Sequence, residues 1–370
     1  MPQKKNQHYV PQFYMRNFSD DGKMIGVYLL KSKRYVPKAP IKNQASKDYM
    51  YSKDPTMENA LSDLEGLADE TIKKIISNPK MKIDGKDKEI LLVFTLLQLG
   101  RTLAQTEKLQ DLTNNACKQR LKAEINQKIG KEINSKLPSA YENVWDKMVF
   151  QLPNPGIYGV GLCAKLLPMC SDLRYKLLIN KTDIDFVTSD NPTCMYDEYL
   201  ERMEDYSVGL ALRGIEIFLP LSPRLAMMYY DKEVYKLGSA HKEYVEISDT
   251  HDIIELNKLV AINAKETLMC KDSSKGMQFF SQYANFHGRL SNQNCVEEIR
   301  FVDSDNNILT GFHTKAKFFK MKLNFLKELP RYAYKDRKNF MFKDRNREIA
   351  YYRGEIIKDF EEYLFKKNPI

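Results

Sequence analysis

The stretch IEIFLPLSPRLAMMYYD, residues 215–231, gives the clearest indication of the fold of this chain. It holds two largely apolar runs, IEIFLPLS and LAMMYYD, and a Pro-Arg pair separates them. Runs of this length, bounded by a turn and rich in aromatic and β-branched residues, are typical of strands. The proline ends the first run, so the stretch predicts two strands that neighbour each other along the chain.

Three more runs of this kind flank the stretch: YKLLIN at 175–180, DIDFVTS at 183–189 and VYKLG at 234–238. Because turns join these runs as neighbours, the sheet is expected to be antiparallel or mixed rather than parallel. Apolar residues at helical spacing predict helices elsewhere, over residues 57–78, 84–110, 158–171 and 250–270. Helices and strands are grouped rather than alternating, which indicates an α+β fold. We expect a helical N-terminal half packed on a central mixed or antiparallel sheet, followed by a basic, strand-rich C-terminal segment.

Domain organisation is less marked, since no repeat or low-complexity linker divides the chain. Residues 1–290 are expected to form one domain. The polar, helical residues of about 111–137 look like an insertion or arm of that domain. Residues 291–370 form the basic C-terminal segment, which either belongs to the same fold or stands beside it.

Composition excludes several classes of protein. Hydrophobic residues make up 43% and charged residues 29% of the 370 residues, so the chain can build a core. No apolar run is long enough to cross a bilayer and no secretory signal is visible, so we expect a cytoplasmic protein without a membrane partner. The six cysteines are scattered without a C-x-x-C pair, which predicts reduced, buried thiols and no zinc site. The sequence leaves a divalent metal cofactor and the oligomeric state open.

The net charge is concentrated near the C-terminus. Residues 315–347 contain twelve Lys or Arg residues and three acids, a net charge of +9 that equals the charge of the whole chain. Aromatic residues alternate with these cations, a combination typical of nucleic-acid surfaces. The alternative is a set of strands with buried rings and solvated lysines. The candidate nucleic-acid-binding residues are Lys315, Lys317, Lys320, Lys322, Arg331, Lys335, Arg337, Lys338, Lys343, Arg345 and Arg347.

No standard catalytic motif is present: the sequence contains no P-loop, no dinucleotide fingerprint, no nucleophile elbow and no H-E-x-x-H. Polar residues in apolar surroundings are therefore the best indicators of a site. Gln98 and Arg101 interrupt a helix that is otherwise Leu, Phe and Val, and their spacing puts them on one face. They are either a buried pair that faces a site or a rim arginine with a buried stem.

Polar residues also follow two strands. Ser189, Asp190 and Asn191 come before Pro192, which fixes the end of the strand. A carboxylate at a strand end is a candidate general base, or a local cap in an Asx-turn. Ser222 ends the next strand in Pro-Leu-Ser-Pro. Asn257 and Asn263 lie in a predicted helix, where asparagine has poor propensity and can face a polar partner.

The N-terminal stretch NQHYVPQFYMRNF, residues 6–18, combines His8, Gln12 and Arg16 with aromatic residues. Its His-Tyr-Val-Pro-Gln start resembles a bacterial family defined as a domain of unknown function, which we call the HYVPQ family. The helical Gln-x-x-Arg, the Ser-Asp-Asn-Pro and Pro-Leu-Ser-Pro turns and the Asn-bearing helix resemble later motifs of that family. The resemblance covers roughly residues 6–270, and the basic segment lies outside it.

The resemblance implies that these distant polar motifs form one site. His8, Asp190 and Arg101 would then be catalytic, with His8 or Asp190 as general base and Arg101 neutralising a developing anion. The candidate substrate-binding residues are Gln12, Arg16, Gln98, Ser189, Asn191, Ser222, Asn257 and Asn263.

Three hypotheses follow from this inventory. The first is a hydrolase of phosphodiester or nucleotide substrates, such as a nuclease-like effector in phage defence or a toxin system, an idea that rests on analogy alone. The second is a non-catalytic module that binds a nucleotide or nucleic acid. The third is a structural polar network that fixes the N-terminal arm to the core.

Overall fold

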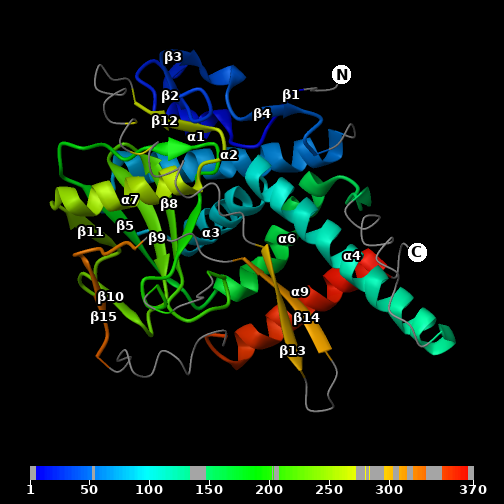
Figure 1. Cartoon of the computed structure of the whole chain (residues 1–370). Helices are drawn as coiled ribbons and strands as arrows, with labels where there is room; N and C mark the ends of the chain where they lie inside the picture. Colours follow the sequence, from blue (N-terminus) through cyan, green and yellow to red (C-terminus); the bar gives the residue numbers. More distant parts are fainter. Residues whose placement is uncertain are drawn as a thin grey trace.

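The computed structural model describes residues 6–51, 55–133, 147–201, 203, 208–271, 280, 283, 296–302, 308–314, 320–330 and 344–365. The protein has the expected α+β fold (Figure 1). Its central strands lie where the sequence predicts them. Within residues 215–231, the chain forms β8 (Glu216–Ser222) and β9 (Leu225–Tyr230), which pair antiparallel.

These two strands lie in the middle of a five-stranded sheet, and every residue in them is buried. The strand order is β11-β5-β9-β8-β7, with β5 (Arg174–Asn180), β7 (Cys194–Tyr196) and β11 (Tyr244–Ile247). Only the β11–β5 pair is parallel, so the sheet is mixed, as expected. Burial on both faces explains why the runs are continuously apolar rather than alternating.

Successive residues of the central sheet enter two different hydrophobic cores. Leu219 and Leu177 contribute to a core shared with α1 (Gln12–Arg16), α2 (Pro55–Ser77) and α3 (Gly85–Gly100). Phe218 and Leu178 contribute to a core on the other face, which α7 (Thr250–Asn263) covers. We call these the α3 core and the α7 core.

A second, four-stranded sheet lies above the first in Figure 1, with the order β3-β2-β12-β6. It contains an N-terminal hairpin, β2 (Met24–Leu29) and β3 (Arg34–Pro40), together with β6 (Thr188–Ser189) and β12 (Thr267–Cys270). The residues before this hairpin, which we call the N-terminal arm, form β1 (Asn6–His8). This strand pairs with β4 (Ser46–Asp48), which follows η1 (Ile41–Asn43). Segments from the start, middle and end of residues 6–270 therefore meet in one small sheet.

Two predicted helices are shorter than expected. The helix over 84–110 is broken at Arg101 and Thr102, where α3 ends and α4 (Leu103–Ile133) begins. The break follows Gly100, whose Cα packs against Gly159 of α6 (Pro155–Cys170) so closely that a Cβ would clash. The helix over 250–270 ends at Asn263, because 267–270 pairs as β12 between β2 and β6. Sheet pairing overrides the helical pattern there.

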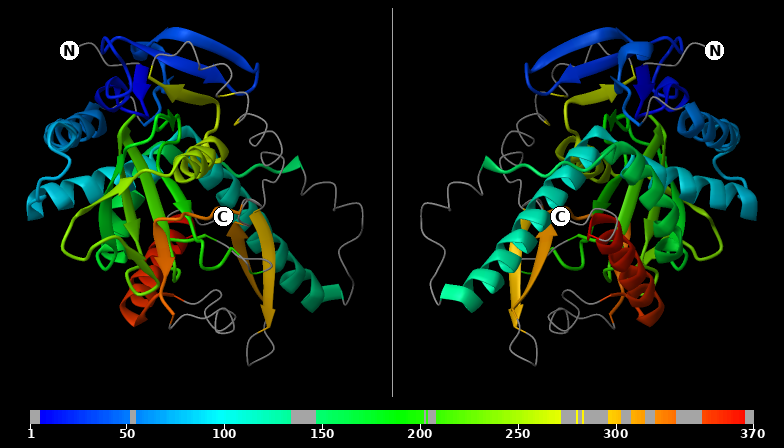
Figure 2. Two further views of the ribbon diagram at one scale, coloured as in Figure 1. Left: turned by 90° about the vertical axis from the view of Figure 1, so that its left-hand side faces the viewer. Right: turned by 90° about the vertical axis from the view of Figure 1, so that its right-hand side faces the viewer.

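The insertion or arm expected over residues of about 111–137 is, in its described part, the continuation of α4. This helix runs outward from the body (Figures 1 and 2). In the C-terminal segment, β13 (Val296–Val302) pairs with β14 (Ile308–Thr314), and β15 (Leu326–Glu328) pairs with β10 (Tyr235–Leu237). The last described element is the helix α9 (Arg347–Phe365), which packs against α6.

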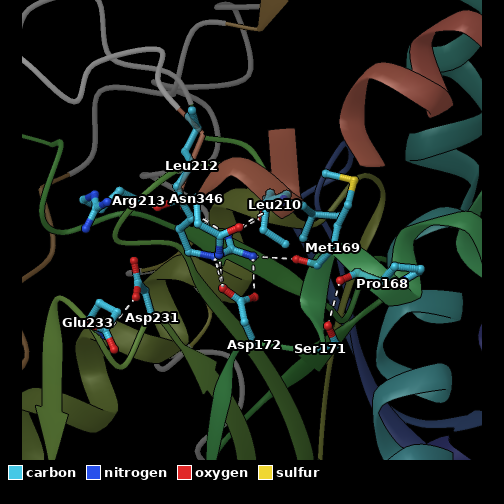
Figure 3. Close-up of polar contacts among 12 residues, drawn as sticks. Pro168, Met169, Ser171, Asp172, Leu210, Leu212, Arg213, Asp231, Glu233 and Asn346 are labelled. Atoms are coloured by element: carbon cyan, nitrogen blue, oxygen red, sulfur yellow. Dashed lines mark hydrogen bonds and ion pairs between the residues drawn. The ribbon is translucent and has the colours of Figure 1, made fainter. Parts of the chain in front are cut away.

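Arg345 ties the start of α9 to the body, and Figure 3 labels four of the residues that its guanidinium contacts: Met169, Asp172, Leu210 and Leu212. Its guanidinium is buried and forms two bonds of 2.9 Å with the carboxylate of Asp172. It also donates to the carbonyls of Met169, Leu210 and Leu212. A carboxylate and three carbonyls satisfy this buried cation, so it acts as a structural anchor.

Candidate functional site

The N-terminal arm presents alternate side chains to opposite sides. Gln7 is buried, and its Oε1 accepts the backbone N–H of Tyr51 at 2.8 Å. Tyr9 is also buried, while its backbone N–H donates to Ala45 at 2.9 Å. Between them, the imidazole of His8 is half-buried, with Nε2 3.2 Å from the carbonyl of Lys42. Because extended residues alternate, Gln7 and Tyr9 point inward and the His8 ring lies on the other side.

Arg101 holds this arm in place. It is 1% exposed, and its Nε donates to the Tyr51 hydroxyl at 2.9 Å. Its two terminal nitrogens donate to Glu65 at 2.7 Å and to the backbone carbonyl of His8 at 2.6 Å. The arginine is therefore buried rather than at the rim, and its contact with position 8 is to the backbone.

Asp190 lies at the end of β6, where it is 1% exposed. Its carboxylate oxygens accept the backbone N–H groups of Lys265 and Glu266 at 2.9 and 2.7 Å. Burial raises the pKa of Asp190 to about 7, although these amide bonds act in the opposite direction. Burial, and then the charge of Asp190, raises the pKa of Tyr9 well above its usual range. The charge of Asp190 therefore acts on the inner residue of the N-terminal arm, Tyr9.

Asn191 joins three elements. The hydroxyl of Thr102 donates to its Oδ1 at 2.8 Å, and its Nδ2 donates to the Asn263 carbonyl at 2.9 Å. Asn263 returns a bond of 2.7 Å from its Nδ2 to the Asn191 carbonyl. Ser189 accepts the Asn191 N–H at 3.1 Å. These bonds lock the strand end onto α7 and onto the break between α3 and α4.

The remaining substrate-binding candidates lie apart from Asp190. Asn257 accepts the Val187 N–H at 3.0 Å and donates to the Asp185 carbonyl at 2.9 Å, so it fixes the backbone before β6. Ser222 accepts the Arg224 N–H at 3.3 Å within the β8–β9 turn. Gln12 and Arg16 form the expected pair one turn apart, 3.4 Å between Oε1 and a guanidinium nitrogen, on the outer side of α1. Their roles stay predictions.

The structure therefore ties Arg101 to the backbone of position 8 and ties Asn191 to Thr102, the residue after Arg101, while the charge of Asp190 acts on Tyr9. The His8 Nε2 lies 3.2 Å from the carbonyl of Lys42, and the catalytic role expected for His8 stays a prediction. Sequence reasoning missed Tyr9, Tyr51 and Thr102. The alternation of an extended strand could have indicated Tyr9, since it places Tyr9 opposite His8.

The described ranges of the chain contain neither a metal-binding group of side chains nor a membrane-spanning helix. Within them, no group of three or more His, Cys, Asp or Glu side chains is arranged to hold a metal ion. No helix in that part of the chain combines the length and the apolar character needed to cross a membrane.

A second candidate surface lies on β10 and β15. Lys236 and Lys327 are direct cross-strand partners, and both are exposed. Lys320 and Lys322 are also exposed, on the segment that leads into β15. We call these four residues the lysine face. Lys236 and Lys327 were not singled out from the sequence, because their pairing depends on strand register.

The other candidates of the basic segment divide into three groups. Arg345 is buried in the anchor at the start of α9, so it does not reach the surface. Arg347 is exposed at the start of α9. The rest lie outside the described residues: Lys315, Lys317, Arg331, Lys335, Arg337, Lys338 and Lys343.

The two candidate sites are far apart. β1 and β4 lie at the top of Figure 1, whereas β10 and β15 lie at the bottom left, and both views in Figure 2 keep this separation in height. The lysine face therefore does not line the polar network around Asp190.

Comparison with known proteins gives a family. Residues 6–274 match the family model described as Protein of unknown function (DUF4238), and the chain belongs to this family. The resemblance to a family of unknown function is thereby confirmed, and the match ends before the basic segment, as expected. No curated protein and no solved structure matches the chain.

Proposed function

We propose that the protein binds nucleic acid, with the lysine face on the phosphodiester backbone. The observation that carries this proposal is the pairing of Lys236 with Lys327 across β10 and β15. Like charges directly opposite each other destabilise a strand pair, and in the described part of the chain neither ammonium has an ion-pair partner. A bound polyanion removes this repulsion and releases counterions.

Fluorescence anisotropy with single-stranded DNA and RNA at several salt concentrations tests the proposal. The double variant Lys236→Glu/Lys327→Glu is expected to weaken binding and to reduce the slope of log Kd against log salt, by roughly one for each phosphate that the variant no longer neutralises. The matched control is Lys38→Glu/Lys47→Glu, which makes the same charge change on exposed lysines of the N-terminal sheets. Equal weakening in both variants, or no binding by the parent chain, contradicts the proposal.

Hydrolysis of a phosphodiester or nucleotide is the second candidate function. It is favoured by Asp190, whose pKa of about 7 lets it take or give a proton near neutral pH. Such an activity would fit a nuclease-like effector in phage defence or a toxin system. The saturation of Asp190 and Arg101 by protein partners favours binding over catalysis.

Degradation of DNA, RNA and dinucleotides by Asp190→Asn, Tyr9→Phe and His8→Ala variants separates these possibilities. If Asp190 is the base, Asp190→Asn abolishes product formation, and Tyr9→Phe reduces it. A folded Asp190→Asn variant with full turnover removes this centre from the chemistry. Binding without any product from the parent chain leaves the binding function alone.

A further inference from the structure

Residues 320–328, which lead into β15 and form it, carry three of the four lysines of the lysine face. We call these residues the strap. Along the strap, Met321 and Leu323 are each 1% exposed and belong to the α7 core, whereas Lys320 and Lys322 are exposed. The strap lies outside the family match, yet its apolar side chains complete a core of the family domain.

Acidic side chains that follow β7 accept the backbone N–H groups of the strap. The Oε2 of Glu201 accepts the Met321 N–H at 3.1 Å, and the Oε2 of Glu198 accepts the Leu323 N–H at 3.3 Å. The Tyr196 hydroxyl donates to Glu201 and itself accepts the Met321 N–H at 2.8 Å. Carboxylates therefore hold the buried side of the strap while its lysines lie on the exposed side.

The start of α7 adds two more carboxylates on the strap. Asp252 accepts the Asn324 N–H at 2.7 Å, and Asp249 accepts a bond of 2.7 Å from the Asn324 side chain. Burial raises the pKa of Asp252, whereas the His251 N–H lowers that of Asp249. The strap is thus held by acids from two different elements of the family domain.

Glu216 of β8 connects these carboxylates to β10. It is 2% exposed, it pairs with Tyr196 across β7 and β8, and its Oε1 accepts the Glu198 N–H at 3.2 Å. On the other side, burial and then the charge of Glu216 raise the pKa of Tyr235, the residue before Lys236. One buried carboxyl therefore neighbours both strands of the lysine face.

The remaining titratable groups around Glu216 are mostly acids and phenols. Tyr230 pairs with Glu216 across β8 and β9, and Arg174 of β5 acts on Tyr230 against the effect of burial. The charge of Glu201 acts on Glu216 itself, and that of Asp197 acts on Tyr235. These surroundings favour a neutral carboxyl at position 216.

The protonation of Glu216 follows from this environment. Burial, and then the charge of Glu198, raises its pKa to about 8, although the Glu198 N–H and the Tyr235 hydroxyl act in the opposite direction. Ionisation of Glu216 adds a third negative charge beside Glu198 and Glu201, the two carboxylates that hold the strap.

We infer that Glu198, Glu201 and Glu216 form a proton-dependent clasp, which holds the strap while Glu216 is protonated and loosens it when Glu216 ionises. The effect on nucleic-acid binding rests on the proposed function, because the strap carries three lysines of the lysine face. Release of the strap lets water reach Glu216 and returns its pKa towards 4.5. Release therefore becomes about tenfold more favourable for each pH unit between about 4.5 and 8, and levels off above 8.

Hydrogen exchange of the full chain, followed by mass spectrometry at pH 6 and pH 8, tests the clasp without any ligand. Exchange of the strap is expressed relative to the intrinsic rate at the same pH. In the parent chain, protection of the strap is expected to fall about a hundredfold between these pH values. Glu216→Gln, which keeps the neutral form at every pH, is expected to lose this dependence.

Two further variants make the comparison specific. Glu198→Gln keeps an oxygen that can accept the Leu323 N–H but removes the neighbouring charge, so it should reduce the pH dependence without abolishing it. The matched control is Glu233→Gln, at an exposed carboxyl just before β10, which should behave like the parent chain. The amides of α3 serve as an internal reference for global unfolding.

The outcomes separate the clasp from the proposed function. Equal pH dependence of the strap in the parent chain and in Glu216→Gln overturns the clasp, as does an equal change in the amides of α3. Fluorescence anisotropy with single-stranded DNA should show weaker binding at pH 8 than at pH 6 in the parent chain and a smaller difference in Glu216→Gln. No binding at either pH removes the proposed function and leaves hydrogen exchange to decide the clasp. Binding that ignores a strap released at pH 8 overturns the link between the clasp and the lysine face.

Discussion

At the scale of single residues, buried polar groups set the character of this protein. Arg101 and Arg345 lie in the interior, and carboxylates and carbonyls satisfy both guanidiniums. Glu216 is buried at the start of β8, and its Oε1 accepts the Glu198 N–H at 3.2 Å. Burial, and then the charge of Glu198, raises the pKa of Glu216 to about 8. Such groups make stability depend on pH and on single side chains.

The raised pKa of Glu216 predicts a stability that falls with rising pH. The native chain holds this proton more tightly than the unfolded chain, so stability decreases between about pH 4.5 and 8. Glu216→Gln removes the cost of burying a charge. It is expected to raise the free energy of unfolding at pH 8 by a few kcal/mol and to change it little at pH 4. Urea denaturation across this range measures the difference, and Glu89→Gln, at an exposed carboxyl, is the control.

Replacing Arg101 is expected to release the arm. Arg101→Met leaves the Tyr51 hydroxyl, Glu65 and the His8 carbonyl without their cation, at a cost of about 3 kcal/mol. Hydrogen exchange at the Tyr9 amide should accelerate in this variant. Arg16→Met, at an exposed arginine of the same region, should leave both measurements unchanged, and full protection of Tyr9 in Arg101→Met would contradict the anchoring role.

At the scale of elements, close backbone contact explains where α3 stops. The Cβ of an alanine at position 100 would lie 2.7 Å from the Gly159 carbonyl oxygen of α6. This contact lets α3 and α6 approach, and it sets the break that turns Arg101 and Thr102 toward the arm and Asn191. The position of the polar network therefore depends on two glycines as well as on polar residues.

Alanine substitutions of two helical glycines should have opposite effects. Gly100→Ala is expected to destabilise the protein by about 1 to 3 kcal/mol, because α6 must shift. Gly66→Ala in α2 meets no atom within 4 Å and is expected to stabilise by about 0.5 to 1 kcal/mol through helix propensity. Chemical denaturation of both variants tests the pair. A neutral Gly100→Ala would mean that the α3–α6 contact is loose.

At the scale of the whole molecule, the C-terminal helix is joined to the family domain. Arg345 forms its bonds to residues that border α6 and β5, and Lys165 of α6 pairs with Asp359 of α9. The segment beyond residue 274 lies outside the family match, yet its described end packs on that domain. The lysine face is joined to the same domain through the pairing of β15 with β10.

Loss of Arg345 should detach α9. Arg345→Met removes every guanidinium bond of the anchor and leaves the Asp172 carboxylate without its cation, with an expected cost of about 3 to 5 kcal/mol. Limited proteolysis should then release a fragment that carries α9 while the rest of the chain stays folded. Arg347→Met, at an exposed neighbour, is the control. Unchanged protease resistance in Arg345→Met would show that the α6–α9 contact suffices.

The amino-acid sequence alone predicts the α+β class, the central strands and the helices over residues 57–78 and 158–171, because runs of apolar residues at period two or 3.6 reflect local backbone geometry. It also indicated that Gln98, Arg101, Asp190 and Asn191 are unusual. Three features come only from the folded structure: residues 267–270 join a sheet, Arg345 is buried, and Lys236 meets Lys327 across β10 and β15. These features depend on strand register and on contacts between distant segments, which no local pattern encodes.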